Sequence, residues 1–419
     1  MKYPKWINVH QKLDRKVDPD PAETVRKQLV SMAPPVKPGD RIAITAGSRY
    51  ISNLVDMTKA VADYLKSRGA EPFLVPAMGS HGGATDQGQL KVLADFGFTE
   101  QRLAVPIHAS MDVVELGEVN GIPVFFDKNA YTADGIVVIN RVKPHQFFKK
   151  EIQSGLNKMM ALGLGKKKGA DTIHGCGRTD ILGDIGDFIC SRTTILFGVA
   201  ILENAYDETR NVVVLTPEKF KEIDATWAKK ARSLMPKIPI RDLDLIIVEE
   251  MGKDISGSGM DTNVIGFTRR LNPSGQVAVA LAVLDLTDKS GGNAIGIGLA
   301  DFVTQRLVNK VDREKTNINV IATGVYSAGR IPITLASEQE IIGVILAKMG
   351  KPEKARIIRI KNTFRIDAFM ATDSLLEDID KNEALSVIGK PMDTVFSEDH
   401  ALVFEYQAAD RRESTTARK

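Results

Sequence analysis

Three of the six histidines in this 419-residue chain lie in short segments rich in glycine, proline or serine. They are His81 in GSHGGAT, His145 in KPHQFF and His174 in IHGCG. Imidazole titrates near neutral pH and ligates metals, so these segments point to acid–base or metal chemistry. Taken singly, each histidine is equally well explained as a capping or surface residue of a turn. Three together favour a site, because glycine lets a loop backbone approach a ligand closely.

A lysine segment, SGLNK at 154–158, lies between the second and third of these histidines and precedes the run GLGKKKG at 163–169. One interpretation is a phosphate cradle, but no GxxxxGK[ST] pattern follows a strand here. Lys166 and its two lysine neighbours also fit a solvated basic loop. Lys158 also fits an ordinary helical lysine beside core methionines. Cys176 lies two residues after His174, but without a CxxC pair a structural zinc site is not indicated.

Arg49, in the turn GSR, has the planar fork of donors that binds a carboxylate through two hydrogen bonds. It equally fits a surface ion pair. The glycines of 252–259 would let backbone amides approach an anion, or would simply form a tight turn.

Short apolar runs alternate with amphipathic segments in the first half of the chain, which predicts a mostly parallel α/β sheet with right-handed crossovers. The predicted strands are 41–45, 72–76 and 135–140, and the predicted helices are 54–68 and 89–96. Arg49, His81 and His145 each follow a predicted strand. Ligands bind beyond the carboxyl ends of such strands, so we expect these three residues to share one site.

A proline-containing linker at 234–240 divides the chain into two expected α/β domains, 1–235 and 236–419, with a cleft between them. The N-terminal domain is expected to bind the cofactor and carry catalysis, and the C-terminal domain to close the active site. Strands of the second domain are predicted at 244–249, 276–283, 317–323 and 356–360. Glycine-rich stretches at 252–259 and 290–298 are predicted to be functional loops.

Composition excludes several classes of protein. The net charge of +3 argues against a nucleic-acid-binding protein, which normally presents a concentrated basic face. The two cysteines are too few for a disulfide framework and fit a reducing compartment. No apolar stretch reaches the roughly 20 residues that span a bilayer, and the N-terminus lacks the apolar core of a signal peptide. A cytoplasmic protein that binds neither nucleic acid nor membrane is expected.

In combination, these motifs resemble the nickel-dependent lactate racemase family. Arg49 matches the family's substrate-carboxylate arginine, and His81 and His145 match its two catalytic histidines. Lys158, in the Ser-Gly-x-x-Lys element, matches the lysine bonded to the cofactor, and His174 matches the nickel ligand. The resemblance covers both expected domains, and the motifs are specific only together.

The resemblance implies a nickel-pincer nucleotide, the nickel complex of pyridinium-3-thioamide-5-thiocarboxylic acid mononucleotide. Lys158 would hold it covalently, with Ser154, Gly155 and Lys166 in the surrounding cofactor site and His174 on nickel. It also implies reversible hydride transfer between the Cα of a 2-hydroxy acid and the cofactor ring. His81 and His145 would form the acid–base pair that serves the two alcohol configurations. Enzymes that make the cofactor would be required as partners.

Two departures from the family pattern concern the substrate. Ala46 stands where lactate racemase has an aspartate three residues before its arginine, and 146–157 is longer and more basic. A 2-hydroxy acid larger or more polar than lactate is therefore plausible. The stretches that contain Lys253, Asn263 and Arg330 are expected to face the cleft, without assigned roles.

Two other classes of function remain open at this stage. One is a non-catalytic protein that binds the nickel nucleotide or a sugar acid, although binding alone does not require two acid–base histidines. The other is a metal-dependent hydrolase, such as a zinc enzyme, built on the three histidines. That reading leaves Lys158 unexplained and has no HExxH arrangement to support it.

Overall fold

The chain divides into two compact units. A computed structural model describes residues 2–144, 150–178, 180–266 and 278–404. Asp14–Met235 forms one unit, named here the N-terminal unit. Met1–Leu13 and Pro236–Lys419 together form the other, named here the C-terminal unit.

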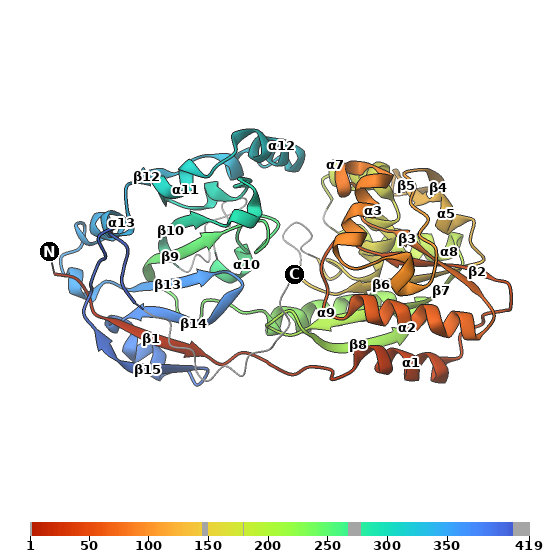
Figure 1. Ribbon diagram of the computed structural model, residues 1–419, viewed down its shortest axis with the longest axis horizontal. Helices are drawn as coiled ribbons and strands as arrows, with labels where there is room; N and C mark the ends of the chain where they lie inside the picture. Colours follow the sequence, from red (N-terminus) through yellow and green to blue (C-terminus); the bar gives the residue numbers. More distant parts are fainter. Residues whose placement is uncertain (1, 145–149, 179, 267–277, 405–419) are drawn as a thin grey trace. The chain divides into compact units, whose positions relative to one another are not determined.

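The N-terminal unit alternates strands and helices over most of its length (Figure 1). Its strands are β2 (Arg41–Ala46), β3 (Glu71–Pro76), β4 (Val113–Val119), β5 (Ile122–Asp127), β6 (Gly135–Arg141), β7 (Ile195–Glu203) and β8 (Thr209–Leu215). Its α-helices are α1 (Pro21–Met32), α2 (Leu54–Ser67), α3 (Asp86–Asp95), α4 (Glu100–Leu103), α5 (Lys128–Tyr131), α6 (Leu156–Lys158), α7 (Lys166–Gly175), α8 (Leu182–Arg192) and α9 (Phe220–Leu234). The π-helix η2 (Met159–Gly163) and the 3₁₀ turns η1 (Gly82–Ala84) and η3 (Pro217–Lys219) complete it.

A five-stranded sheet in the order β3-β2-β6-β7-β8 forms the centre of this unit. The first four strands are parallel and β8 is antiparallel. Alternate residues of each strand enter two separate cores: Ile42 and Ile44 join α1 and α2 on one face, while Ala43 joins α6, α8 and α9 on the other. Burial on both faces explains the nearly continuous apolar strands in the sequence.

The C-terminal unit follows the same plan with a larger sheet. Its strands are β1 (Trp6–Gln11), β9 (Leu243–Met251), β10 (Ala278–Leu286), β11 (Phe302–Thr304), β12 (Ile333–Leu335), β13 (Ile357–Asn362), β14 (Arg365–Thr372) and β15 (Leu385–Met392). Its α-helices are α10 (Thr262–Ile265), α11 (Gln305–Asn309), α12 (Arg313–Thr323), α13 (Glu338–Leu346) and α14 (Leu376–Asp380). Short 3₁₀ turns are η4 (Asp288–Ser290), η5 (Ile297–Leu299), η6 (Tyr326–Gly329), η7 (Pro352–Lys354) and η8 (Asp373–Leu375).

Eight strands form this sheet in the order β12-β11-β10-β9-β13-β14-β1-β15. The first five are parallel, and β14, β1 and β15 extend the sheet in antiparallel fashion. The expected division into 1–235 and 236–419 therefore differs from the structure in its first thirteen residues. They belong with the C-terminal unit because β1 pairs with β14 and β15.

The α/β class with mostly parallel sheets is confirmed, as are the strands predicted at 41–45, 72–76, 135–140, 244–249 and 356–360. The helices predicted at 54–68 and 89–96 are α2 and α3, and the strand predicted at 276–283 corresponds to β10 from residue 278 onward. The strand predicted at 317–323 is wrong, because these residues lie in helix α12. The Asp312 carboxylate accepts a hydrogen bond from the Lys315 amide at the helix start, and left-handed Gly324 ends it.

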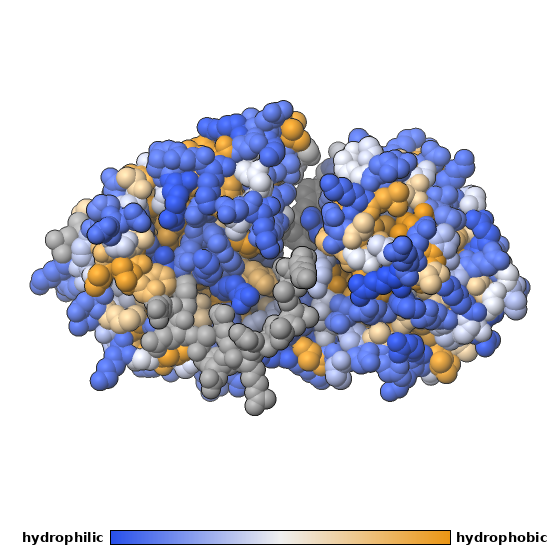
Figure 2. Space-filling model, in the orientation of Figure 1, coloured by the Kyte–Doolittle hydropathy of each residue, from blue (hydrophilic) through white to orange (hydrophobic). Residues whose placement is uncertain are grey.

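Hydrophilic residues dominate the visible face of each unit, and smaller hydrophobic areas are scattered among them on that face (Figure 2). Among the described residues, no helix is both long and apolar enough to cross a membrane.

Candidate functional site

The predicted site residues of the N-terminal unit gather at the carboxyl ends of its parallel strands. Arg49 follows β2 and His81 follows β3; Arg141, which was not predicted, is the last residue of β6. The chain places β3 on one side of β2 and β6 on the other, so the crossover direction reverses between β2 and β6. Such a reversal is where open α/β sheets bind ligands.

Lys158 ends the short helix α6, whose first turn is fixed by a buried carboxylate on α9. Asp224 Oδ1 accepts from the Leu156 amide at 3.0 Å, and Oδ2 accepts from the Asn157 amide at 2.9 Å and side chain at 2.7 Å. These bonds satisfy amides that a helix start leaves without partners. Asp224 is fully buried, and burial raises the pKa of its carboxyl to about 7, against the opposing effect of the hydrogen bonds.

Gly155 is required at the start of this helix for two reasons. Its φ of +92° and ψ of −150° lie in a region open essentially to glycine alone. A Cβ atom there would also lie 1.9 Å from Asp224 Oδ1. The Gly155 carbonyl in turn accepts a hydrogen bond from Asn140 at the end of β6, at 2.8 Å. The Ser-Gly-x-x-Lys element is thus tied to both the sheet and α9.

The π-helix η2 follows Lys158 directly. Insertions of this kind occur often at functional sites. Loops that follow β2 and β3 pack closely on η2: a Cβ on Gly47 would lie 3.1 Å from Met159 Cε, and the Gly79 amide donates to the Gly163 carbonyl at 3.2 Å. The loops that hold Arg49 and His81 therefore contact the helix that extends from Lys158.

Two arginines act electrostatically on Lys158. Burial, together with the charges of Arg49 and Arg141, lowers the pKa of the Lys158 ammonium to about 7. The Arg49 residue has solvent-exposed surface, but its guanidinium lies among protein atoms that partly remove it from water. This desolvation, ahead of repulsion from Arg141, lowers the pKa of Arg49. Glu203, at the end of β7, forms an ion pair with Arg141. The arrangement favours an anionic ligand beside Lys158.

His174 lies near the end of α7, sixteen residues beyond Lys158, and is exposed. Partial desolvation, and then the charge of Lys158, lower the pKa of the His174 imidazole against the pull of Asp171. The structure therefore brings Lys158 and His174 within electrostatic reach of each other. A neutral imidazole is the form that ligates a metal. Cys176 Sγ donates to the Ile173 carbonyl at 3.0 Å, within the same helix end.

His81 lies at the tip of the loop after β3 and is exposed. Its Nδ1 shares a hydrogen bond with the hydroxyl of Ser48, in the loop after β2. This contact joins the loop that bears His81 to the one that bears Arg49. The hydrogen bond that Nδ1 makes influences which ring nitrogen carries the proton.

Ser154 is buried, and its hydroxyl bridges the backbone of Lys143. It donates to the Lys143 carbonyl at 2.5 Å and accepts from the Lys143 amide at 2.7 Å. Ser154 thus fixes the chain just before 145–149. The second predicted catalytic histidine, His145, lies outside the described residues, and its role stays a prediction.

Lys166 is separated from the gathered residues. Its side chain is fully buried and its ammonium lies 2.9 Å from Asp127 Oδ2, which is equally buried. For Lys166 this contradicts the solvated basic loop considered from the sequence, and it is at odds with contact to a nucleotide. The reason is that the run 166–168 begins helix α7, so its first lysine points into the core while Lys167 and Lys168 are exposed.

Ala46, where the family pattern has aspartate, is the last residue of β2 and packs in a core of the unit. Two residues important to the site escaped the sequence interpretation. Arg141 closes a strand that was predicted, so its position after an apolar run is a usable signal. Asp224 lies on a helix far along the chain, and no local pattern marks its contact with the Lys158 helix.

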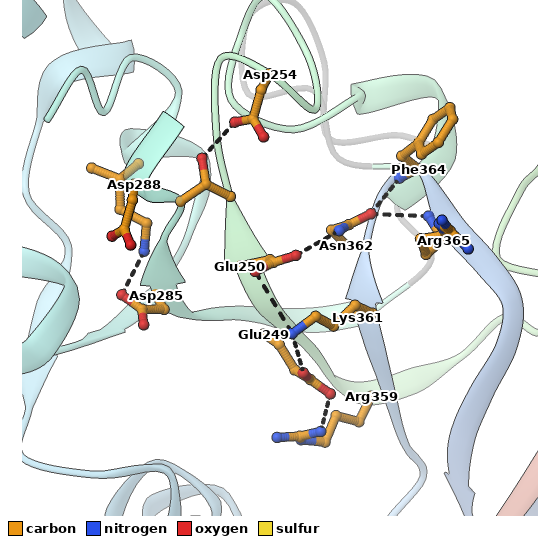
Figure 3. A network of polar contacts seen from close by, with 12 residues as sticks. Glu249, Glu250, Asp254, Asp285, Asp288, Arg359, Lys361, Asn362, Phe364 and Arg365 are labelled. Atoms are coloured by element: carbon orange, nitrogen blue, oxygen red, sulfur yellow. Dashed lines mark hydrogen bonds and ion pairs between the residues drawn. The ribbon is translucent and has the colours of Figure 1, made fainter. Parts of the chain in front are cut away.

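The matching strand ends of the C-terminal unit hold a network of paired charges (Figure 3). Glu249 on β9 contacts Arg359 and lies 3.2 Å from the ammonium of Lys361, both on β13. Asp285 on β10 lies 3.0 Å from the ammonium of Lys310. No cluster that could hold a metal ion occurs among the residues that the structure describes.

The three unassigned residues of this unit differ in their surroundings. The Lys253 ammonium donates to the Gly257 carbonyl at 3.0 Å and to Asn319 Oδ1 at 3.1 Å. The side chain of Asn263 donates to a carboxylate two residues before it, at 3.0 Å. Arg330 is exposed. These contacts give none of the three a chemical role.

Comparison with known proteins defines the fold. No family model and no curated protein matches the sequence. Among solved structures, the lactate racemase apoprotein from Thermoanaerobacterium thermosaccharolyticum is similar, with a TM-score of 0.50 and 12% identity over 86% of this chain and 99% of that chain. A structural-genomics target from Thermotoga maritima has a TM-score of 0.48 and 16% identity, over 64% of this chain and 72% of that chain. The chain has a lactate racemase-like fold.

Proposed function

We propose that this protein is a racemase or epimerase of a 2-hydroxy acid that uses a nickel-pincer nucleotide bound covalently to Lys158. The proposal rests on one observation: Arg49, Lys158 and His174 gather beside the ends of one parallel sheet, with Lys158 electrostatically coupled to the other two. The lactate racemase-like fold supports it.

The residues present suit such a group. With a pKa near 7, Lys158 supplies a substantial fraction of neutral amine, the form that makes an amide-type bond. His174, with its pKa lowered, supplies a neutral imidazole for nickel. Arg49 and Arg141 supply positive charge for anionic groups on the nucleotide and the substrate. When bound, the group supplies a reversible hydride acceptor for the substrate Cα–H.

The remaining chemistry belongs to side chains of the chain itself. Arg49 binds the substrate carboxylate through its guanidinium fork. His81, oriented through Nδ1 by Ser48, accepts the hydroxyl proton of one enantiomer at Nε2 and returns it in the reverse direction. His145 serves the other enantiomer. Because Ala46 replaces the aspartate of lactate racemase and 146–157 is longer and more basic, the proposed substrate is larger or more polar than lactate.

The test is co-expression with the enzymes that make the cofactor, followed by intact mass, peptide mapping and nickel analysis. We expect a single mass gain on Lys158 and about one nickel per chain. His174→Ala should lose most of the nickel, whereas a control substitution of exposed Lys167→Ala should retain both the adduct and the nickel.

The proposal would be overturned if Lys158 stayed unmodified under these conditions, or if the protein contained stoichiometric zinc in place of nickel. A panel of 2-hydroxy acids with chiral analysis of the products then identifies the substrate. An adduct with nickel but no turnover on any acid of the panel would instead indicate a protein that binds the cofactor without catalysing racemisation.

A further inference from the structure

Lys166, Asp127 and Gln89 form a buried polar chain that the proposed chemistry does not use. Lys166 and Asp127 are both fully buried, and their charged atoms are 2.9 Å apart. Burial lowers the pKa of Lys166 and raises the pKa of Asp127, and in each case the partner's charge opposes the change. A buried ion pair contributes little net stability, so its presence is better explained by the geometry it imposes.

The Lys166 ammonium has three polar neighbours. It forms the ion pair with Asp127, and it donates to the carbonyl of Pro76 at the end of β3 and to Gln89 Oε1 at 3.5 Å. An ammonium has three donors and no acceptor. Lys166 itself has a left-handed φ of +53°, uncommon for a residue with a side chain, which points to a tightly determined position.

Gln89, on α3, links Lys166 to the loop after β3 by hydrogen bonds. Its side chain is fully buried, and Nε2 donates to the carbonyls of Gly79 at 2.9 Å and His81 at 3.4 Å. Lysine only donates, so Oε1 must face Lys166 and Nε2 must face the two carbonyls. The reverse orientation would set Nε2 against the ammonium and Oε1 against two oxygens. The lysine charge therefore fixes the direction of the amide.

The loop held in this way contains residues with wide backbone freedom. Gly82 and Gly83 both have positive φ values, 67° and 66°, and the His81 side chain is exposed. Gln89 holds the carbonyls on both sides of Ser80, and so sets where the imidazole of the next residue lies. Figure 1 shows α7, which begins at Lys166, beside α3, which bears Gln89.

We propose that Gln89, oriented by the Lys166–Asp127 pair, is a positioning residue. It holds the His81 loop in the position that proton transfer requires. The inference rests on the proposed acid–base role of His81. It also reassigns Lys166, from a residue that contacts the nucleotide to one that acts through Gln89. Because α7 also bears His174, the same helix orients the metal ligand and, through this chain, the histidine loop.

The experiment compares Gln89→Met with the control Gln87→Met, an exposed glutamine on the same helix. Methionine keeps the shape of Gln89 and leaves the ion pair intact, but removes both donors. In the apo protein, we expect at least tenfold faster amide hydrogen exchange over 79–85 and an altered His81 imidazole titration in NMR spectra. Gln87→Met should change neither. In the loaded enzyme, we expect kcat to fall about 10- to 100-fold, with KM changed less than threefold, because a small displacement of a catalytic group costs this much.

Gln89→Glu is the second variant, in case Gln89→Met does not fold. It keeps the acceptor for Lys166 and loses the two donors, so it should loosen the same loop. Exchange and titration equal to those of the control would overturn the inference, as would a loosened loop with unchanged kcat. Failure of the proposed function is visible separately, because Lys158 would then stay unmodified in the wild-type chain while the apo measurements still report on the loop.

Discussion

The two units place opposite charge arrangements at the same position of the same architecture. At the strand ends of the N-terminal unit, Arg49, Arg141 and Lys158 repel one another, and the pKa of Lys158 falls to about 7, first through burial and then through this repulsion. In the C-terminal unit, Arg359, in the middle of β13, lies between the carboxylates of Glu249 and Glu338, and Lys361 near the end of β13 lies 3.2 Å from Glu249. Glu203 pairs with Arg141 in the first region, yet the remaining positive charge still contributes to the lowered pKa of Lys158. In the second region, cations and carboxylates pair with one another.

This difference shows that architecture alone does not mark the candidate site. Both sheets present parallel strand ends with glycine-containing loops, and both have polar side chains there. In the paired network, removing one member leaves a buried charge without its partner, whereas in the cationic region removing one charge relieves repulsion that an anionic ligand would otherwise relieve. Substitutions in the two regions should therefore change stability in opposite directions.

The largest expected effect is on the balanced side. Arg359→Met should lower the free energy of unfolding by about 3–5 kcal/mol, because it leaves the buried carboxylate of Glu338 without its cation. Urea denaturation of the apo protein measures it. The matched control is exposed Arg365→Met on the adjacent strand, expected within about 0.5 kcal/mol of wild type. Equal losses in both variants would remove the distinction between the two regions.

The second effect has the opposite sign. Lys158→Met should stabilise the apo protein by about 1–3 kcal/mol at pH 6. The folded pKa of about 7 lies below the ordinary lysine value, so the unfolded chain binds more protons between about pH 7 and 10.5. Stability of the wild type therefore rises with pH across this window, and the advantage of the variant disappears by its upper end.

Urea denaturation at several pH values tests this, with Lys167→Met, an exposed lysine paired with Asp171, as the control. The control should differ from wild type by less than about 0.5 kcal/mol throughout. A destabilising effect of Lys158→Met at pH 6 would mean that the cations around Lys158 do not oppose one another as inferred.

The smallest effect concerns the charge of Arg49 alone. Arg49→Gln removes one cation near Lys158 and should raise the pKa of Lys158 toward its ordinary value. Arg68→Gln, exposed at the end of α2, should leave it unchanged. The rate of acetylation of Lys158 as a function of pH, followed by peptide mapping, measures the shift. If the pH dependence of acetylation for Arg49→Gln coincides with that of the control, Arg49 does not influence the pKa of Lys158.

Much of the framework was predictable because it depends on local patterns. The apolar runs at 41–45, 72–76 and 135–140 identify the central strands, and their ends place Arg49 and the His81 loop at one edge of the sheet. The same reliance on local patterns produced the wrong prediction at 317–323. The β-branched residues of this stretch suggest a strand, while the caps at Asp312 and Gly324 favour a helix.

The remainder depends on contacts between distant residues. Lys166 is first in a run of three lysines, and only its pairing with Asp127, on a hairpin strand well before it, makes it a core residue. Asp224 determines the geometry of the Lys158 helix from another part of the chain. No local spacing encodes these pairs, because a charged residue is compatible with solvent until the fold supplies a buried partner.

Strand β1 and its partners in the sheet are synthesised at different times. It is made before Asp14–Met235, whereas its partners β14 and β15 are made after that unit. At roughly 5–20 residues per second, the N-terminal unit can leave the ribosome and fold while β1 waits roughly 8–30 s longer for its neighbours. During that interval β1 presents an unpaired apolar edge, a template for association with other chains. The unit that bears Lys158 can therefore complete its fold before the C-terminal unit can complete its sheet.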